Sequence, residues 1–215
     1  MKNEKSFSIL GDSYSTYEGY IPKEYPSWYG AWDENVQSVE DTWWYKLSDN
    51  LGMQLLCNCS YSGSTVCTTG HEDVKDPNQA FVIRMKDYFG EKNISDMKPD
   101  ILFVEGGIND SYANSPIGEV QYANWTKEDL KKALPAFCYM LDYLKTYNPN
   151  VRIICLISFT VSLEIETGYL EACEHYGIEY LVFPSGELNN GHPTTKGHQC
   201  IYETVKRYIE YKQSL

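Results

Sequence analysis

The sequence predicts an α/β protein with three layers, an α/β/α sandwich in which helices cover both faces of a five-stranded parallel sheet. Short, continuous apolar runs are typical of strands that are buried on both faces. Such runs alternate here with segments of helical periodicity. The strand candidates are 6–10, 53–57, 101–105, 151–157 and 179–183. The clearest helix candidates are 127–147, 164–176 and 195–211.

Local signals mark where several of these elements end. The first strand candidate, Phe7-Ser8-Ile9-Leu10, stops at a glycine, and the second, Met53-Gln54-Leu55-Leu56-Cys57, leads into a polar segment. Asn148-Pro149-Asn150 ends the long helical segment, and Gly177 follows the next one. We also expect Trp43 and Trp44 to lie in a helix and to pack in the core.

The length of the chain favours a single domain that spans residues 1–215. The 215 residues contain no repeat, no low-complexity stretch and no linker rich in Pro, Gly and Ser. A chain of this length can bury roughly 70% of the surface that its unfolded form exposes. No second domain is needed to account for a stable fold.

Charge and cysteine content exclude several classes of function. A net charge of −12 disfavours nucleic acid and anionic membrane surfaces as partners. No apolar run reaches the roughly 18 residues of a membrane span, and the first strand candidate begins too early for a signal peptide, so we expect a cytoplasmic protein. The seven cysteines are an odd number without a CxxC pair. We therefore expect reduced thiols, no metal site and no cofactor.

A serine hydroxyl lies where the first strand candidate ends, in Gly11-Asp12-Ser13-Tyr14-Ser15. Three other polar segments also follow strand candidates, at 58–65, 106–110 and 189–193. Ligands bind at the carboxyl edge of an open parallel sheet, so these four loops are expected to meet at one cleft. A hydroxyl becomes a nucleophile only when a base takes its proton and donors stabilise the oxyanion.

In this order the four segments resemble the motifs of the SGNH hydrolases, the GDSL-type lipase and acylhydrolase superfamily. The resemblance spans nearly the whole chain and implies the flavodoxin-like fold of that superfamily. It implies that Ser13 is the nucleophile and that its backbone N–H serves the oxyanion hole. Gly63 would lend a second N–H and Asn109 its side-chain amide. His192, which is followed by proline, would be the general base.

One position departs from the family pattern. An aspartate usually precedes the histidine by three residues, and here that residue is Asn189. The amide oxygen of Asn189 could orient the His192 ring without supplying charge. Glu187 could supply the carboxylate if the loop folds back. If neither contacts the ring, a backbone carbonyl could orient it and leave a dyad of Ser13 and His192.

Tyrosine and tryptophan are crowded into the segment that follows the nucleophile. This segment lacks helical or alternating periodicity until about Val39, so we expect a long irregular loop. Aromatic faces with polar edges suit stacking on sugar rings, which makes Tyr14, Trp28 and Trp32 candidates for substrate binding. The alternative is a loop whose aromatic side chains pack against one another and against the sheet.

From these features we expect a serine esterase that transfers a short acyl group, above all acetyl, from a carbohydrate or another small polar alcohol to water. Its partner is then a small-molecule or glycan ester. One alternative is a lipase or thioesterase for longer acyl chains, which would need an apolar groove. Another is an attenuated member of the superfamily that binds its ligand without turnover, as the residue at 189 suggests.

Overall fold

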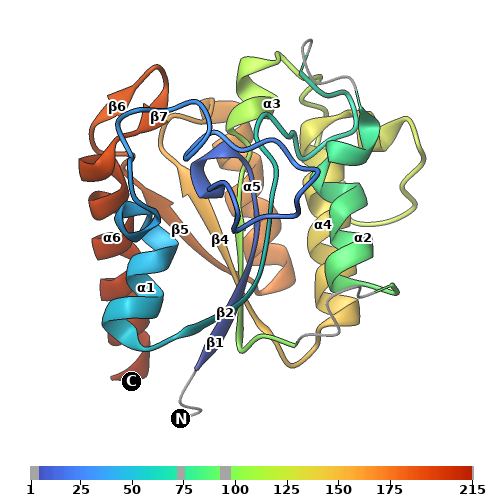
Figure 1. Ribbon diagram of the computed structural model, residues 1–215. Helices are drawn as coiled ribbons and strands as arrows, with labels where there is room; N and C mark the ends of the chain where they lie inside the picture. The colour runs from blue at the N-terminus through green and yellow to red at the C-terminus, as the bar shows by residue number, and fades with distance from the viewer. Residues whose placement is uncertain (1–4, 72–75, 93–97, 215) are drawn as a thin grey trace.

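The core of the protein is a parallel sheet of five strands in the order β2-β1-β3-β4-β5. The computed structural model describes residues 5–71, 76–92 and 98–214 (Figure 1). All five predicted strands are present. Their bounds are Ser6–Gly11 for β1, Gln54–Ser60 for β2, Ile101–Glu105 for β3, Arg152–Ser158 for β4 and Glu179–Phe183 for β5.

Helices cover both faces of this sheet, which confirms the predicted α/β/α arrangement. In Figure 1, α1 (Trp43–Leu51) and α6 (Thr195–Gln213) lie together on one side. The other side carries α2 (Phe81–Phe89), α4 (Ala133–Tyr147) and α5 (Leu163–Tyr176). Within the described part of the chain, no helix is both long and apolar enough to cross a membrane.

Aromatic side chains fill the layer between β1, β3 and α1. The Phe103 ring meets the rings of Phe7 and Trp43 edge to face, with centroids 5.8 and 5.6 Å apart. Trp43 and Trp44 are both buried, as predicted. The Trp43 indole N–H donates to Ser15 Oγ at 3.2 Å, so the core also contacts the turn that follows β1.

The long helix begins later than the sequence predicts. Helical periodicity starts at residue 127, but α4 begins at Ala133. Pro135 explains the difference, because its ring would clash with the carbonyl group of Lys131, four residues earlier, if the helix continued toward its N-terminus. The residues before Ala133 form instead a turn and one short 3-10 helix, Asp129–Lys131.

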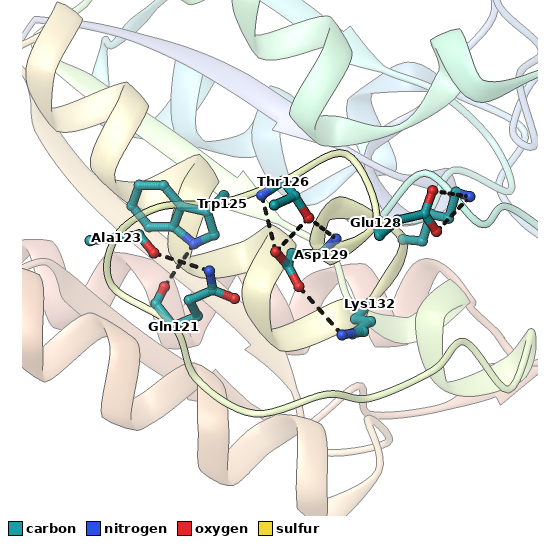
Figure 2. A network of polar contacts seen from close by, with 8 residues as sticks. Gln121, Ala123, Trp125, Thr126, Glu128, Asp129 and Lys132 are labelled. Atoms are coloured by element: carbon teal, nitrogen blue, oxygen red, sulfur yellow. Dashed lines mark hydrogen bonds and ion pairs between the residues drawn. The ribbon is translucent and has the colours of Figure 1, made fainter.

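Side-chain contacts hold this turn in place. The Asp129 carboxylate accepts hydrogen bonds from the Thr126 backbone N–H at 3.0 Å and from its hydroxyl at 2.7 Å (Figure 2). Lys132 Nζ lies 3.4 Å from the same carboxylate. Just before the turn, the Trp125 indole N–H donates to the Gln121 carbonyl group at 2.8 Å. The connection into α4 is therefore ordered by its own polar groups.

Candidate functional site

The predicted nucleophile lies in a 3-10 turn, Ser13–Ser15, directly after β1. Asp12 caps this turn, because its Oδ1 accepts a hydrogen bond from the Tyr14 backbone N–H at 3.0 Å. The Thr16 hydroxyl donates to the Ser13 carbonyl oxygen at 2.9 Å. Because β1 lies between β2 and β3 in the sheet, these contacts hold the Ser13 hydroxyl at the carboxyl edge.

The predicted base lies on a small hairpin, in which β6 (Leu188–Asn189) pairs antiparallel with β7 (His192–Pro193). The two residues between them, Asn190 and Gly191, have φ angles of +48° and +76°. Positive φ at both central residues is the type I′ geometry that two-residue hairpins favour, and an Asn-Gly pair adopts it readily. The turn brings His192 Nε2 to 2.9 Å from Ser13 Oγ.

The other ring nitrogen of His192 contacts the protein backbone. Nδ1 lies 3.0 Å from the Asn190 carbonyl oxygen, two residues earlier in the hairpin. If Nδ1 carries the proton, the carbonyl accepts it and Nε2 presents its lone pair to Ser13. Burial lowers the pKa of His192, while this hydrogen bond and the charge of Asp33 act in the opposite direction.

Neither side chain predicted to orient His192 contacts Nδ1. The Glu187 carboxylate accepts hydrogen bonds from Thr194 Oγ1 and from Lys196 Nζ, each at 3.1 Å. Asn189 pairs with His192 only in the register of the hairpin and is exposed to solvent. Of the three alternatives that the sequence left open, the contact at Nδ1 matches the backbone carbonyl, here that of Asn190. The tight turn explains this contact, because it places the Asn190 carbonyl oxygen beside Nδ1.

A cavity of about 440 Å³ opens at these two residues. Besides Ser13 and His192, its lining includes Asn109, which is carried by the short helix α3 (Ile108–Tyr112) after β3. Asn109 Nδ2 donates to the Ser64 carbonyl oxygen at 2.9 Å and has a longer contact, 3.4 Å, to Asp12. Gly63 precedes Ser64 and has φ +81°, a conformation that favours glycine. The four motif segments thus meet at one place.

The three aromatic candidates for substrate binding have different positions. Tyr14 is buried in the cavity wall, and its hydroxyl donates to the Gly191 carbonyl oxygen at 2.7 Å. Trp28 stacks on His192, with ring centroids 3.7 Å apart and planes 9° from parallel. Trp32 is 78% exposed and lines a second cavity, formed within the segment 18–32. Of these three, Tyr14 and Trp28 therefore contact the hairpin that carries the base.

A buried arginine beneath the site was not predicted from the sequence. Arg84 lies on α2 and is 1% exposed. Its guanidinium donates to the Gly11 carbonyl oxygen at 3.0 Å, to Ser64 Oγ at 2.9 Å and to the Cys59 carbonyl oxygen. It therefore connects the end of β1, the end of β2 and the segment that contains Gly63. The helical spacing of apolar residues over 81–89 would have indicated α2, but no motif marks its arginine.

Buried carboxyl groups surround the nucleophile turn. Glu105 Oε2 accepts a hydrogen bond from Ser15 Oγ at 3.0 Å. Burial raises the pKa of Glu105 well above its ordinary value, and the nearby Asp12 raises it further. Asp110 accepts from the backbone N–H groups of Val66 at 2.8 Å and Cys67 at 3.2 Å. Burial raises the pKa of Asp110 to about 6.

Two histidines other than His192, His198 and His71, have different surroundings. His198 is buried on α6, where its Nδ1 accepts a hydrogen bond from the Trp43 backbone N–H at 3.3 Å. Burial lowers the pKa of His198 to about 3, so this side chain is neutral, in line with a structural position. His71 lines the same cavity as Ser13, which the sequence did not indicate. Among the described residues, no group of three or more His, Cys, Asp and Glu side chains could hold a metal ion.

Comparison with known proteins identifies relatives of the whole chain. A family model for GDSL-like lipases and acylhydrolases matches residues 5–209. A protein from Bacteroides ovatus ATCC 8483, described as a GDSL-like lipase, is 37% identical with a TM-score of 0.88, and the match covers 97% of this chain and 99% of that chain. Its counterpart from Bacteroides uniformis ATCC 8492 is 41% identical, with a TM-score of 0.87 and 96% coverage of both chains.

More distant structures share the fold. An acetyl xylan esterase from Butyrivibrio proteoclasticus is 20% identical, with a TM-score of 0.65, and the match covers 98% of this chain and 64% of that chain. At this identity the likeness concerns the fold alone. The comparison with curated proteins finds no match.

The buried Glu105 carboxyl leads to a prediction about stability. Its pKa is raised in the folded state, so the folded chain keeps a proton that the unfolded chain releases above the ordinary pKa of 4.5. This contribution to stability is present below that pH and is lost as the pH rises, at up to about 1.4 kcal/mol per pH unit. Glu105→Gln should therefore give a free energy of unfolding that falls less between pH 5 and pH 8.

Urea unfolding at four pH values across this range would measure the effect. Glu210→Gln, which changes an exposed acid on α6, serves as the matched control and should follow the wild-type pH dependence. An unchanged pH dependence in Glu105→Gln would mean that the buried carboxyl is already ionised in the folded protein.

Proposed function

This chain belongs to the GDSL-like lipase/acylhydrolase family and is a carboxylic ester hydrolase, and from that premise we propose that it cleaves short-chain esters. The preferred acyl group is acetyl, carried by a carbohydrate or another small polar alcohol, and the reaction passes through an acyl-enzyme on Ser13. The observation that carries the proposal is the 2.9 Å contact between His192 Nε2 and Ser13 Oγ beside the 440 Å³ cavity.

The proposed reaction has two steps. Ser13 Oγ attacks the acyl carbon while its proton passes to His192 Nε2, and the carbonyl oxygen becomes an oxyanion. His192 then gives the proton to the departing alcohol, and a water molecule hydrolyses the acyl-enzyme by the reverse sequence. The oxyanion donors would be the backbone N–H groups of Ser13 and Gly63 and the side-chain amide of Asn109. One amide hydrogen of Asn109 is donated to the Ser64 carbonyl oxygen, and the other makes only the long contact to Asp12, so it would be available to the oxyanion.

Size and polarity of the cavity support a small, polar substrate. Its lining mixes the apolar side chain of Ile108 with the polar groups of Tyr112 and Asn190. A long acyl chain would need a continuous apolar groove, which this mixture does not offer. The acetyl xylan esterase that shares the fold acts, by its name, on an acetylated polysaccharide, and that is the class of substrate proposed here.

Reactivity of Ser13 is the first prediction of this proposal. The serine stands beside a neutral imidazole in a pre-formed cavity, so a fluorophosphonate probe should label the native protein at Ser13. Ser13→Ala and heat-unfolded protein should not be labelled at that position, as peptide mass spectrometry can establish. Folded wild-type protein that resists the probe would favour the alternative of a binding protein without turnover, which Asn189, in place of the family's aspartate, suggests.

Acyl chain length provides the second prediction. The small cavity and its mixed lining should make acetyl and propionyl esters of p-nitrophenol better substrates, by kcat/KM, than octanoyl or longer esters. Steady-state kinetics across the series, at concentrations below micelle formation, would measure this preference. An efficiency that rises with chain length would instead support a lipase or thioesterase.

The third prediction concerns the group that orients His192. Because Glu187 contacts Thr194 and Lys196 at the surface, Glu187→Gln should keep turnover of p-nitrophenyl acetate within about threefold of wild type. Asn189→Ala should do the same, whereas His192→Ala should remove nearly all turnover with little loss of stability. A hundredfold loss in a folded Glu187→Gln variant would contradict the assignment of the Asn190 carbonyl as the acceptor.

A further inference from the structure

The indole ring of Trp28 covers one face of the His192 imidazole. The ring centroids are 3.7 Å apart and the planes differ by 9°, so the two rings lie flat against each other. Two neutral aromatic rings prefer an offset or an edge-to-face arrangement. A cation, by contrast, is attracted to the face of an aromatic ring, and tryptophan is the strongest partner for it. The geometry suits a histidine that becomes charged.

Among the described residues, no carboxylate forms a hydrogen bond with His192, so its charged form lacks the partner that a triad provides. Nδ1 contacts the neutral Asn190 carbonyl oxygen, and Asp33 acts on the ring through its charge. The other rings nearby are Tyr14 and Tyr29, with centroids 5.7 and 6.5 Å from that of His192. Both tyrosines carry pKa values raised by burial and are neutral. The buried, neutral His198 adds no counter-charge.

Trp28 is held by the same elements that carry the nucleophile and the base. Its backbone N–H donates to Thr16 Oγ1 at 3.0 Å, and the Thr16 hydroxyl donates to the Ser13 carbonyl oxygen. The next residue, Tyr29, donates from its hydroxyl to the Pro193 carbonyl oxygen at 2.8 Å. The indole N–H is buried and has no hydrogen-bond partner among the described residues. Packing of its ring face, rather than its N–H, therefore sets the position of the indole.

We propose that Trp28 is a positioning residue for His192, whose ring face holds the imidazole in line with Ser13 and stabilises the imidazolium that forms when Ser13 gives up its proton. In this protein the indole then supplies part of the stabilisation that a carboxylate supplies in a Ser-His-Asp triad. The inference rests on the proposed function for the step at which the imidazolium forms. The stacking itself can be tested without turnover.

The test compares two replacements of Trp28. Trp28→Phe keeps an aromatic face, and Trp28→Leu keeps apolar bulk over the ring and removes that face. Two-dimensional NMR titration of the imidazole gives the pKa of His192 in each variant, and hydrolysis of p-nitrophenyl acetate gives kcat, KM and the pH profile. The matched control is Trp125→Leu, which removes an indole from the connection before α4, where it packs on Tyr139.

The expected result separates the aromatic face from bulk. Trp28→Leu should lower the pKa of His192 by about one pH unit and lower kcat roughly three- to thirtyfold, with little change in KM. The acid limb of the pH profile should move to lower pH by the same amount. Trp28→Phe should retain most of the wild-type pKa of His192 and most of kcat, and Trp125→Leu should change neither.

Two results would overturn the proposal. Equal pKa values and equal kcat in the Phe and Leu variants would show that Trp28 only packs against the ring. A loss confined to KM would show that the indole contacts substrate instead. If Trp28→Leu fails to fold, fluorinated tryptophans placed at position 28 keep the shape and withdraw ring electrons, and the pKa of His192 should fall with each added fluorine. Absence of ester turnover in the wild type would defeat the proposed function, while the titration would still decide the stacking.

Discussion

The arrangement of the site depends on one buried cation. The Arg84 guanidinium donates to main-chain oxygens at the ends of two neighbouring strands and to the hydroxyl of Ser64, so it determines how far apart the two motif loops lie. A buried guanidinium is costly unless its donors are satisfied and an opposite charge is near. Burial raises the pKa of Asp12, beside the nucleophile, to about 7, and the charge of Arg84 acts in the opposite direction. The same cation therefore links strand packing to the electrostatics beneath Ser13.

The aromatic segment after the nucleophile works mainly through its packing. The hydroxyl groups of Tyr14 and Tyr29 reach across to the hairpin, where they donate to the carbonyl groups of Gly191 and Pro193. Trp28 lies between them against the base. Sugar stacking was one interpretation of these residues, and self-packing the other. Tyr14 and Trp28 contact the hairpin that carries the base, while Trp32 keeps an exposed face.

Much of this protein could be predicted because the signals are local. Each apolar run, helical period and motif segment is contained in one continuous stretch of sequence, and together they located the sheet, α5, α6 and the meeting of Ser13 with His192. What could not be predicted depends on main-chain atoms, which are the same in every type of residue. The acceptor for His192 is a main-chain oxygen, and the partners of Arg84 are mostly main-chain oxygens as well. The start of α4 was mistaken because periodicity outweighed a proline.

The two-residue turn before His192 has a consequence for how this site tolerates change. Because the acceptor of Nδ1 belongs to the backbone, every amino acid at position 190 that adopts the turn brings the same oxygen with it. What this contact requires is then the shape of a turn and not an acidic side chain at one position. Side chains around the hairpin can therefore make other contacts, as Glu187 does with Lys196, without changing the group that orients the base.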